Sequence, residues 1–169
     1  MTPAVVAADG SYMIRAGDQL FVSVWNEDDL QLEVLVRPDG YFSLPLVGEV
    51  GAADHSIAQV TAQVREALAR FIPEPEVTIM VTEVVGAKFY VIGQVTRPGA
   101  FIMNHPVDVM QALSLAGGTT PFAALGKIKV LRRQGDDQQA IPFDYGEVAK
   151  GENLDQNLLL QSGDVIVVP

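Results

Sequence analysis

Apolar and polar positions in the first half of the chain follow a strand pattern and then change to a helical one. Three short segments rich in β-branched and aromatic residues are predicted as antiparallel strands: residues 20–25, 32–36 and 41–44. From Ser56 to Phe71 apolar residues recur at helical spacing, and Ser56 with Gln59 matches a capping box. The pattern predicts an amphipathic helix that ends before Pro73, followed by a strand over residues 77–84.

A second series of strand patterns begins near Gly86 and encloses one helical segment. Five segments are predicted as strands: residues 88–95, 100–103, 127–133, 140–144 and 164–168. Between the second and the third, His105-Pro106 opens a predicted helix with Pro at its first position, and Gly117-Gly118 end it. The order of two strands, a helix and three strands is that of a β-grasp fold, in which a mixed sheet wraps one helix.

These patterns divide the chain into three parts. We predict a flexible N-terminal segment over residues 1–10, a small sheet-plus-helix domain over residues 11–85 and a β-grasp domain over residues 86–169. The predicted fold class is therefore α+β. With 169 residues, of which 49% are apolar and 19% charged, the chain can build a core without disulfides.

The charge balance and the lack of cysteine exclude several classes of function. The sequence has 21 acidic and 11 basic side chains, a formal charge of −10, and a pI near 4.4. Such a surplus disfavours binding to nucleic acid and to anionic lipid. Without cysteine there is no disulfide, thiolate nucleophile or Cys-ligated metal, and we predict no cofactor. No apolar stretch reaches the ~18–20 residues of a membrane helix, and no export signal is visible.

No group of residues indicates catalysis. His55 and His105 precede predicted helices and are expected to cap them or to lie exposed, with no Ser and carboxylate placed around either. Glu27-Asp28-Asp29 could hold a cation, but successive acids point in different directions and favour a solvated turn. The glycines of Ala116 to Thr120 follow a helix rather than precede one, so they indicate a C-cap and not a phosphate loop. We therefore predict that the protein is not an enzyme.

One concentration of basic side chains lies on the predicted strand over residues 127–133. Lys127, Lys129 and Arg133 are expected on one face of this strand, and Arg132 on the other. Two interpretations remain open. The charges either protect an edge strand from pairing with another chain, or they form a binding site for an acidic sugar.

Two short motifs occur once in each half of the chain. Arg37 to Phe42 resembles Arg97 to Phe101, and Gly17 to Val22 resembles Gly163 to Val168. Each motif is a turn that leads into a strand. Convergent turn chemistry is the simpler explanation of these echoes.

Taken in order, the motifs resemble those of a known family. Four motifs of the first domain match the polysaccharide-export domain of bacterial outer-membrane polysaccharide export proteins: Tyr12 to Asp18, Val36 to Gly40, Leu44 to Gly48 and Pro75 to Val77. Four more resemble the soluble-ligand-binding β-grasp (SLBB) domain that follows it in that family: Val91 to Gly99, Ala112 to Gly118, Val130 to Arg133 and Leu160 to Pro169. The resemblance covers about residues 11–169.

The resemblance implies a role in transport. Family members form homo-oligomeric rings that conduct capsule or exopolysaccharide chains from the periplasm through the outer membrane, together with an inner-membrane polysaccharide copolymerase. The sequence shows no signal peptide, no lipid-bearing cysteine and no C-terminal amphipathic helix, so we expect a soluble fragment or a short member. A short member would need a separate outer-membrane pore protein. In either case the resemblance places the chain in the periplasm, associated with the outer membrane.

The alternative is a carbohydrate-binding module. In this interpretation the β-grasp domain recognises polysaccharide without forming a conduit itself. Arg97, Lys127, Arg132 and Arg133 are the candidate contacts with polysaccharide or with a neighbouring subunit, chosen for their charge and turn position alone.

Overall fold

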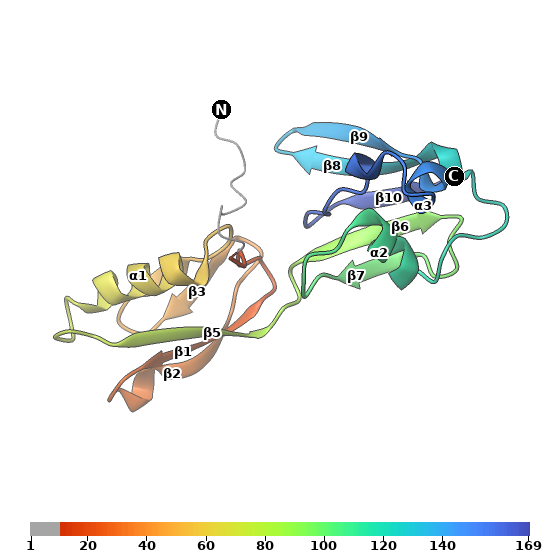
Figure 1. The fold of residues 1–169 in the computed structure, drawn as a ribbon. Coiled ribbons are helices and arrows are strands. Elements are labelled where there is room, and N and C mark those ends of the chain that lie inside the picture. The colour runs from red at the N-terminus through yellow and green to blue at the C-terminus, as the bar shows by residue number, and fades with distance from the viewer. Residues whose placement is uncertain (1–10) are drawn as a thin grey trace. The chain divides into compact units, whose positions relative to one another are not determined.

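The computed structural model describes residues 11–169, which fold into two units that divide between Gly86 and Ala87 (Figure 1). The segment predicted to be flexible, residues 1–10, lies outside the described residues. The architecture is α+β, as predicted, because each unit combines a β-sheet with helices.

The first unit contains a three-stranded sheet, a hairpin and one long helix. Its elements are β1 (Gln19–Val24), a 3-10 turn (Asp28–Leu30), β2 (Gln31–Leu35), β3 (Tyr41–Leu44), β4 (Gly48–Gly51), α1 (Ile57–Leu68) and β5 (Val77–Glu83). The central strand β1 pairs antiparallel with β2 on one side and β5 on the other. Strands β3 and β4 form a separate antiparallel hairpin.

Helix α1 begins where the sequence predicts. Ser56 and Gln59 form both hydrogen bonds of the capping box, and Val60, Val64 and Leu68 are buried at a spacing of four residues. The helix ends at Leu68, earlier than the apolar pattern indicates. Phe71 was therefore wrongly placed on its buried stripe, and its side chain is 58% exposed.

The second unit is a mixed five-stranded sheet with the connectivity of a β-grasp. Its elements are β6 (Lys88–Gly93), β7 (Gly99–Ile102), α2 (Val109–Leu115), a 3-10 turn (Leu125–Lys127), β8 (Ile128–Gln134), β9 (Asp137–Phe143), α3 (Tyr145–Ala149), a 3-10 turn (Leu154–Gln156) and β10 (Val165–Val168). The strand order is β7-β6-β10-β8-β9, with β10 parallel to β6 and the other pairs antiparallel.

The position of β8 corrects one interpretation of the basic cluster. Strand β8 lies between β10 and β9, so it is not an edge strand, and its charges have no edge to protect. Lys127 also lies outside β8, as the last residue of the preceding 3-10 turn. Two elements, β4 and α3, are absent from the predicted set.

Helix α2 begins at Val109, three residues after the predicted start at Pro106. Its N-cap is Asp108, which accepts a hydrogen bond from the Gln111 N–H at 2.8 Å, while the Gln111 side chain accepts one from the Asp108 N–H at 3.0 Å. Pro106 precedes this cap and is not the first helical residue. Ala112 and Leu113 of α2 are buried and belong to the core cluster of the second unit.

Removing this cap should weaken the second unit measurably. We expect Asp108→Ala to lower the free energy of unfolding by about 1 kcal/mol, because an N–H in the first turn of α2 loses its acceptor. Urea denaturation followed by circular dichroism measures this change. Asp136→Ala, in the turn between β8 and β9, is the control and should change stability by less than about 0.5 kcal/mol.

Each unit has its own hydrophobic core. In the first unit, Leu20, Val22 and Phe42 belong to a cluster that also includes the buried face of α1. In the second, Phe89 and Ile166 belong to a cluster on the face of the sheet that α2 covers. Among the described residues, no helix has the length and apolar character needed to cross a membrane.

Candidate functional site

The first Gly-Asp motif forms a turn closed by a buried carboxylate. Asp18 Oδ2 accepts hydrogen bonds from the Tyr12 hydroxyl at 2.5 Å and from the Arg15 N–H at 2.8 Å. Its other oxygen accepts from the N–H groups of Val85 at 3.0 Å and Gly86 at 2.8 Å. Burial and the hydrogen bond to Asp18 raise the pKa of Tyr12 above its ordinary value. Asp18 thus joins the start of β1 to the chain that follows β5.

The second Gly-Asp motif uses its carboxylate in the same way and adds an ion pair. Asp164, 1% exposed, accepts a hydrogen bond from the Gln161 N–H at 2.8 Å through Oδ2. Arg132 donates to both oxygens, from Nε to Oδ1 at 3.0 Å and from Nη2 to Oδ2 at 2.7 Å. Arg132 Nη2 also donates to the Leu159 carbonyl at 3.0 Å. The guanidinium of Arg132 is therefore committed inside the second unit.

The two Gly-Asp turns share their backbone geometry. Gly17 and Gly163 have φ of 98° and 93°, and the Asp after each donates its N–H to the carbonyl three residues back at 3.1 Å. The echo between these motifs thus reflects one type of turn, as predicted. The other echo does not, because Gly40 N–H closes the Arg37 turn at 2.8 Å, whereas Arg97 N–H donates to the Ala116 carbonyl.

The four candidate cations do not converge on one site. Arg132 binds Asp164, and Arg97 Nη2 donates to the Leu115 carbonyl at 2.8 Å, so both support the fold of the second unit. Lys127 and Arg133 are exposed, and their side chains form no hydrogen bond or ion pair with any other described residue. Of the four, these two are free to meet a ligand or a partner.

The second unit leaves one face of its sheet without a covering helix. Tyr90 and Ile92 of β6 and Ile102 of β7 lie on this outer face and are 41%, 48% and 51% exposed. By strand alternation, Lys129 and Arg133 of β8 lie on the same face. The outer face therefore combines an apolar patch with two free cations, a composition suited to contact with a partner rather than to chemistry.

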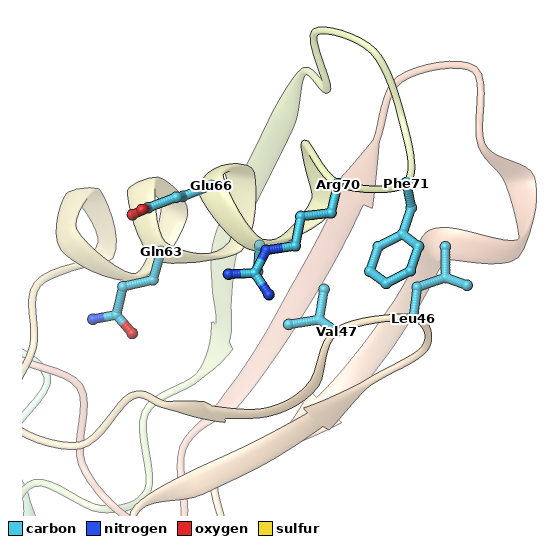
Figure 2. A pocket seen from close by; sticks show the side chains of 7 residues that line it. Leu46, Val47, Gln63, Glu66, Arg70 and Phe71 are labelled. Atoms are coloured by element: carbon cyan, nitrogen blue, oxygen red, sulfur yellow. The ribbon is translucent and has the colours of Figure 1, made fainter.

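A hollow of about 380 Å³ lies beside the end of α1 in the first unit (Figure 2). It is lined by Leu46, Val47, Gln63, Glu66, Ala67, Arg70 and Phe71. Leu46 and Phe71 are 57% and 58% exposed, and Figure 2 shows both side chains at the same end of the hollow. The guanidinium of Arg70 makes no ion pair with another described residue. The hollow presents two large apolar groups and one free cation to the solvent.

A second hollow, of about 340 Å³, lies on the sheet of the same unit and is lined by Ser23, Trp25, Glu76 and Thr78. Trp25 is 76% exposed and is the single tryptophan of the chain. The sequence pattern predicted Trp25 only as the last residue of a strand, whereas Trp25 lies in the turn that follows β1. The available signal is the alternation of β1: continued by one residue beyond the strand, it places Trp25 on the face opposite the buried Val22 and Val24.

The two histidines do not assemble a catalytic group among the described residues. The ring Nδ1 of His55 lies 2.9 Å from the Ala53 carbonyl, and that of His105 lies 3.0 Å from the Pro106 carbonyl. Both rings thus contact local backbone. No group of three or more potential metal-ligating side chains occurs within residues 11–169.

Comparison with known proteins adds two family matches and two relatives. The model of the family described as polysaccharide biosynthesis/export protein matches residues 6–82, and that of the SLBB domain matches residues 87–168. The chain is similar to the EPS I polysaccharide export outer membrane protein EpsA of Ralstonia solanacearum and to the protein of the same name from Ralstonia nicotianae. Each is 23% identical over 193 aligned residues, covering 92% of this chain and 51% of the relative. The chain therefore spans about half the length of these curated relatives.

Proposed function

The chain belongs to the polysaccharide export protein family, and from this membership we propose that it is the periplasmic part of a complex that exports capsule or exopolysaccharide across the outer membrane. The observation that carries the proposal is the succession of the two matched domains, which together occupy residues 6–168 with only a short gap. The name of the EpsA relatives supports it, since they are described as polysaccharide export outer membrane proteins.

We propose further that the chain acts as a homo-oligomeric ring and not as an enzyme. Two surfaces support association between copies: the hollow with Leu46 and Phe71, and the outer face of the β6–β7 hairpin with Tyr90 and Ile92. Large exposed apolar groups in a folded domain are typical of interaction surfaces. A ring would conduct the polymer without breaking or forming covalent bonds in it.

The same proposal assigns partners to the complex. An inner-membrane polysaccharide copolymerase would deliver the polymer, and a separate outer-membrane pore protein would complete the path if no other part of the protein forms it. Of the candidate contacts, Lys127 and Arg133 are proposed to face a neighbouring copy, because this chain carries a net charge of −10 and their charges are unpaired. Arg97 and Arg132 would contribute indirectly, because their hydrogen bonds to Leu115 and Asp164 stabilise the fold of the second unit.

The oligomer proposal predicts a specific response to one substitution. We expect the full chain to form a discrete large oligomer and Phe71→Asp to reduce its mass, because a carboxylate on the apolar hollow must lose its water when a partner covers it. Light scattering over a wide concentration range measures the mass. Phe122→Asp is the matched control: this phenylalanine of the second unit is 85% exposed but belongs to neither of the two proposed surfaces, so the substitution should leave the mass unchanged. Equal masses for the parent chain and Phe71→Asp would argue against this surface as an interface.

A further inference from the structure

The sheet of the first unit has an open face with the composition of a sugar-binding surface. We propose that the outer face of β2, β1 and β5 binds an uncharged segment of polysaccharide, with Trp25 as the stacking platform. The inner face of this sheet packs on α1 through Val22 and Ile79, whose core cluster also contains Val64 of the helix. This inference rests on the proposed function, because it names the surface that the transported polymer would touch.

Trp25 provides the apolar part of this surface. Its side chain is 76% exposed, although burial of a side chain as large and apolar as tryptophan usually stabilises a fold strongly. The backbone of Trp25 is held in place, since its backbone N–H donates to the Glu76 carbonyl at 2.9 Å at the end of the β1–β5 ladder. A pyranose ring has a face made of C–H groups, and a flat, exposed indole can cover that face without losing hydrogen bonds of its own.

The polar part of the surface surrounds the indole. Ser23, Glu76 and Thr78 line the hollow of about 340 Å³ together with Trp25. None of these three side chains forms a hydrogen bond or ion pair with another described residue. Their hydroxyl and carboxylate groups are therefore available to sugar hydroxyls, which can donate to a carboxylate and both donate to and accept from Ser and Thr.

The surface continues along the strands beyond the hollow. On the outer face, Phe21 lies between Glu33 of β2 and Met80 of β5, and Ser23 lies between Gln31 of β2 and Thr78. Each row across the sheet thus places apolar and hydrogen-bonding groups side by side. Strand β1 has six residues, so the face extends about 20 Å and can hold several successive sugar units of a chain.

The charge of this face decides which sugars it accepts. Strands β1, β2 and β5 carry no Lys or Arg, while Glu33 and Glu76 are both exposed on or beside the outer face. Two unpaired carboxylates repel uronate, sulfate and phosphate groups but strengthen hydrogen bonds from neutral hydroxyls. The face therefore favours a neutral polymer segment over an acidic one. Its charge is also opposite in sign to that of the basic cluster over residues 127–133, for which an acidic-sugar site was one of the two interpretations of the sequence.

The single tryptophan gives a direct test with the full chain. We expect the fluorescence of Trp25 to change saturably when cellohexaose or maltohexaose is added, and hexagalacturonate to bind at least about tenfold more weakly. Glu76→Gln should weaken binding of the neutral hexasaccharide several-fold and narrow its advantage over hexagalacturonate, because the repulsion is reduced. Calorimetry extends the test to Trp25→Ala, for which we expect at least about a tenfold loss of affinity.

Phe122→Ala is the matched control for the loss of an exposed aromatic side chain and should bind the neutral hexasaccharides like the parent chain. Circular dichroism confirms that the variants are folded. The inference is overturned if neither neutral hexasaccharide produces a saturable change, or if Trp25→Ala binds like the parent chain. It is also overturned if Trp25 fluorescence changes only with protein concentration while the mass rises, because a second copy would then cover the face. If the chain forms an oligomer but binds no sugar, the sugar-binding inference is wrong while the ring proposal stands. If the chain is a monomer that binds sugar through Trp25, the ring proposal is wrong while the sugar-binding inference stands.

Discussion

Arg132→Ala is expected to lower the free energy of unfolding of the second unit by about 3–5 kcal/mol, because it leaves the buried Asp164 carboxylate without its counter-charge. The side chains of Arg132 and Asp164 are 12% and 1% exposed, so water cannot replace the lost partner well. The Leu159 carbonyl loses a donor as well. Urea denaturation followed by circular dichroism should show unfolding of the second unit at a lower urea concentration than in the parent chain. The fluorescence of Trp25, which lies in the first unit, should report unfolding at the same urea concentration as in the parent chain.

The adjacent arginine provides the control for this prediction. Arg133 is exposed and unpaired among the described residues, so Arg133→Ala should change stability by less than about 0.5 kcal/mol. A double-mutant cycle with Asp164→Ala would then measure the coupling between Arg132 and Asp164. If Arg132→Ala and Arg133→Ala are equally stable, the ion pair does not support the fold as described.

Asp18→Ala should produce the second large effect, in the first unit. The substitution removes the acceptor of four hydrogen bonds, three of them from the backbone N–H groups of Arg15, Val85 and Gly86. We expect a loss of about 3 kcal/mol or more in the free energy of unfolding, since unpaired buried donors keep their full desolvation cost. The fluorescence of Trp25 follows this unit during denaturation.

An exposed carboxylate of the same unit serves as the comparison. Asp39 pairs with Arg37 at 2.9 Å, but its side chain is 55% exposed and water can replace the lost partner, so Asp39→Ala should destabilise the first unit far less than Asp18→Ala does. Asp18→Asn adds a second check, because its amide has the shape of the carboxylate but turns a donor toward N–H groups. A stability of Asp18→Asn equal to that of the parent chain would contradict the network around Asp18.

The sequence was sufficient for elements whose pattern is local. The capping box at Ser56 and the spacing of Val60 and Val64 predict the start and buried face of α1, because both depend on residues within two turns. The end of α1 and the start of α2 were missed by a few residues, since apolar spacing continues to Phe71 and Pro106 also fits a helix start. Strand β4 has two glycines and a single apolar residue among its four positions, and α3 has only five residues, so neither shows a recognisable period.

The candidate surfaces were harder to predict because they depend on pairing between distant segments. The alternation of side chains along a strand correctly predicts that Arg132 and Arg133 lie on opposite faces of the sheet. Only the fold, however, brings Asp164, 32 residues away in the sequence, to Arg132. The edge-strand interpretation of β8 failed for the same reason, since strand order is set by β10 at the end of the chain. Trp25 gains its polar neighbours only when β1 pairs with β5, which brings Thr78 of β5 and Glu76, just before that strand, beside it.

The central claim is that this protein serves polysaccharide export, and deleting its gene in the native bacterium tests that claim most directly. Polysaccharide should then be measured separately on the cell surface, in the medium and in the periplasm. The account predicts that surface and secreted polymer disappear, that polymer accumulates inside the outer membrane, and that a plasmid copy of the gene restores export. Unchanged surface and secreted polysaccharide in the deletion strain would contradict it.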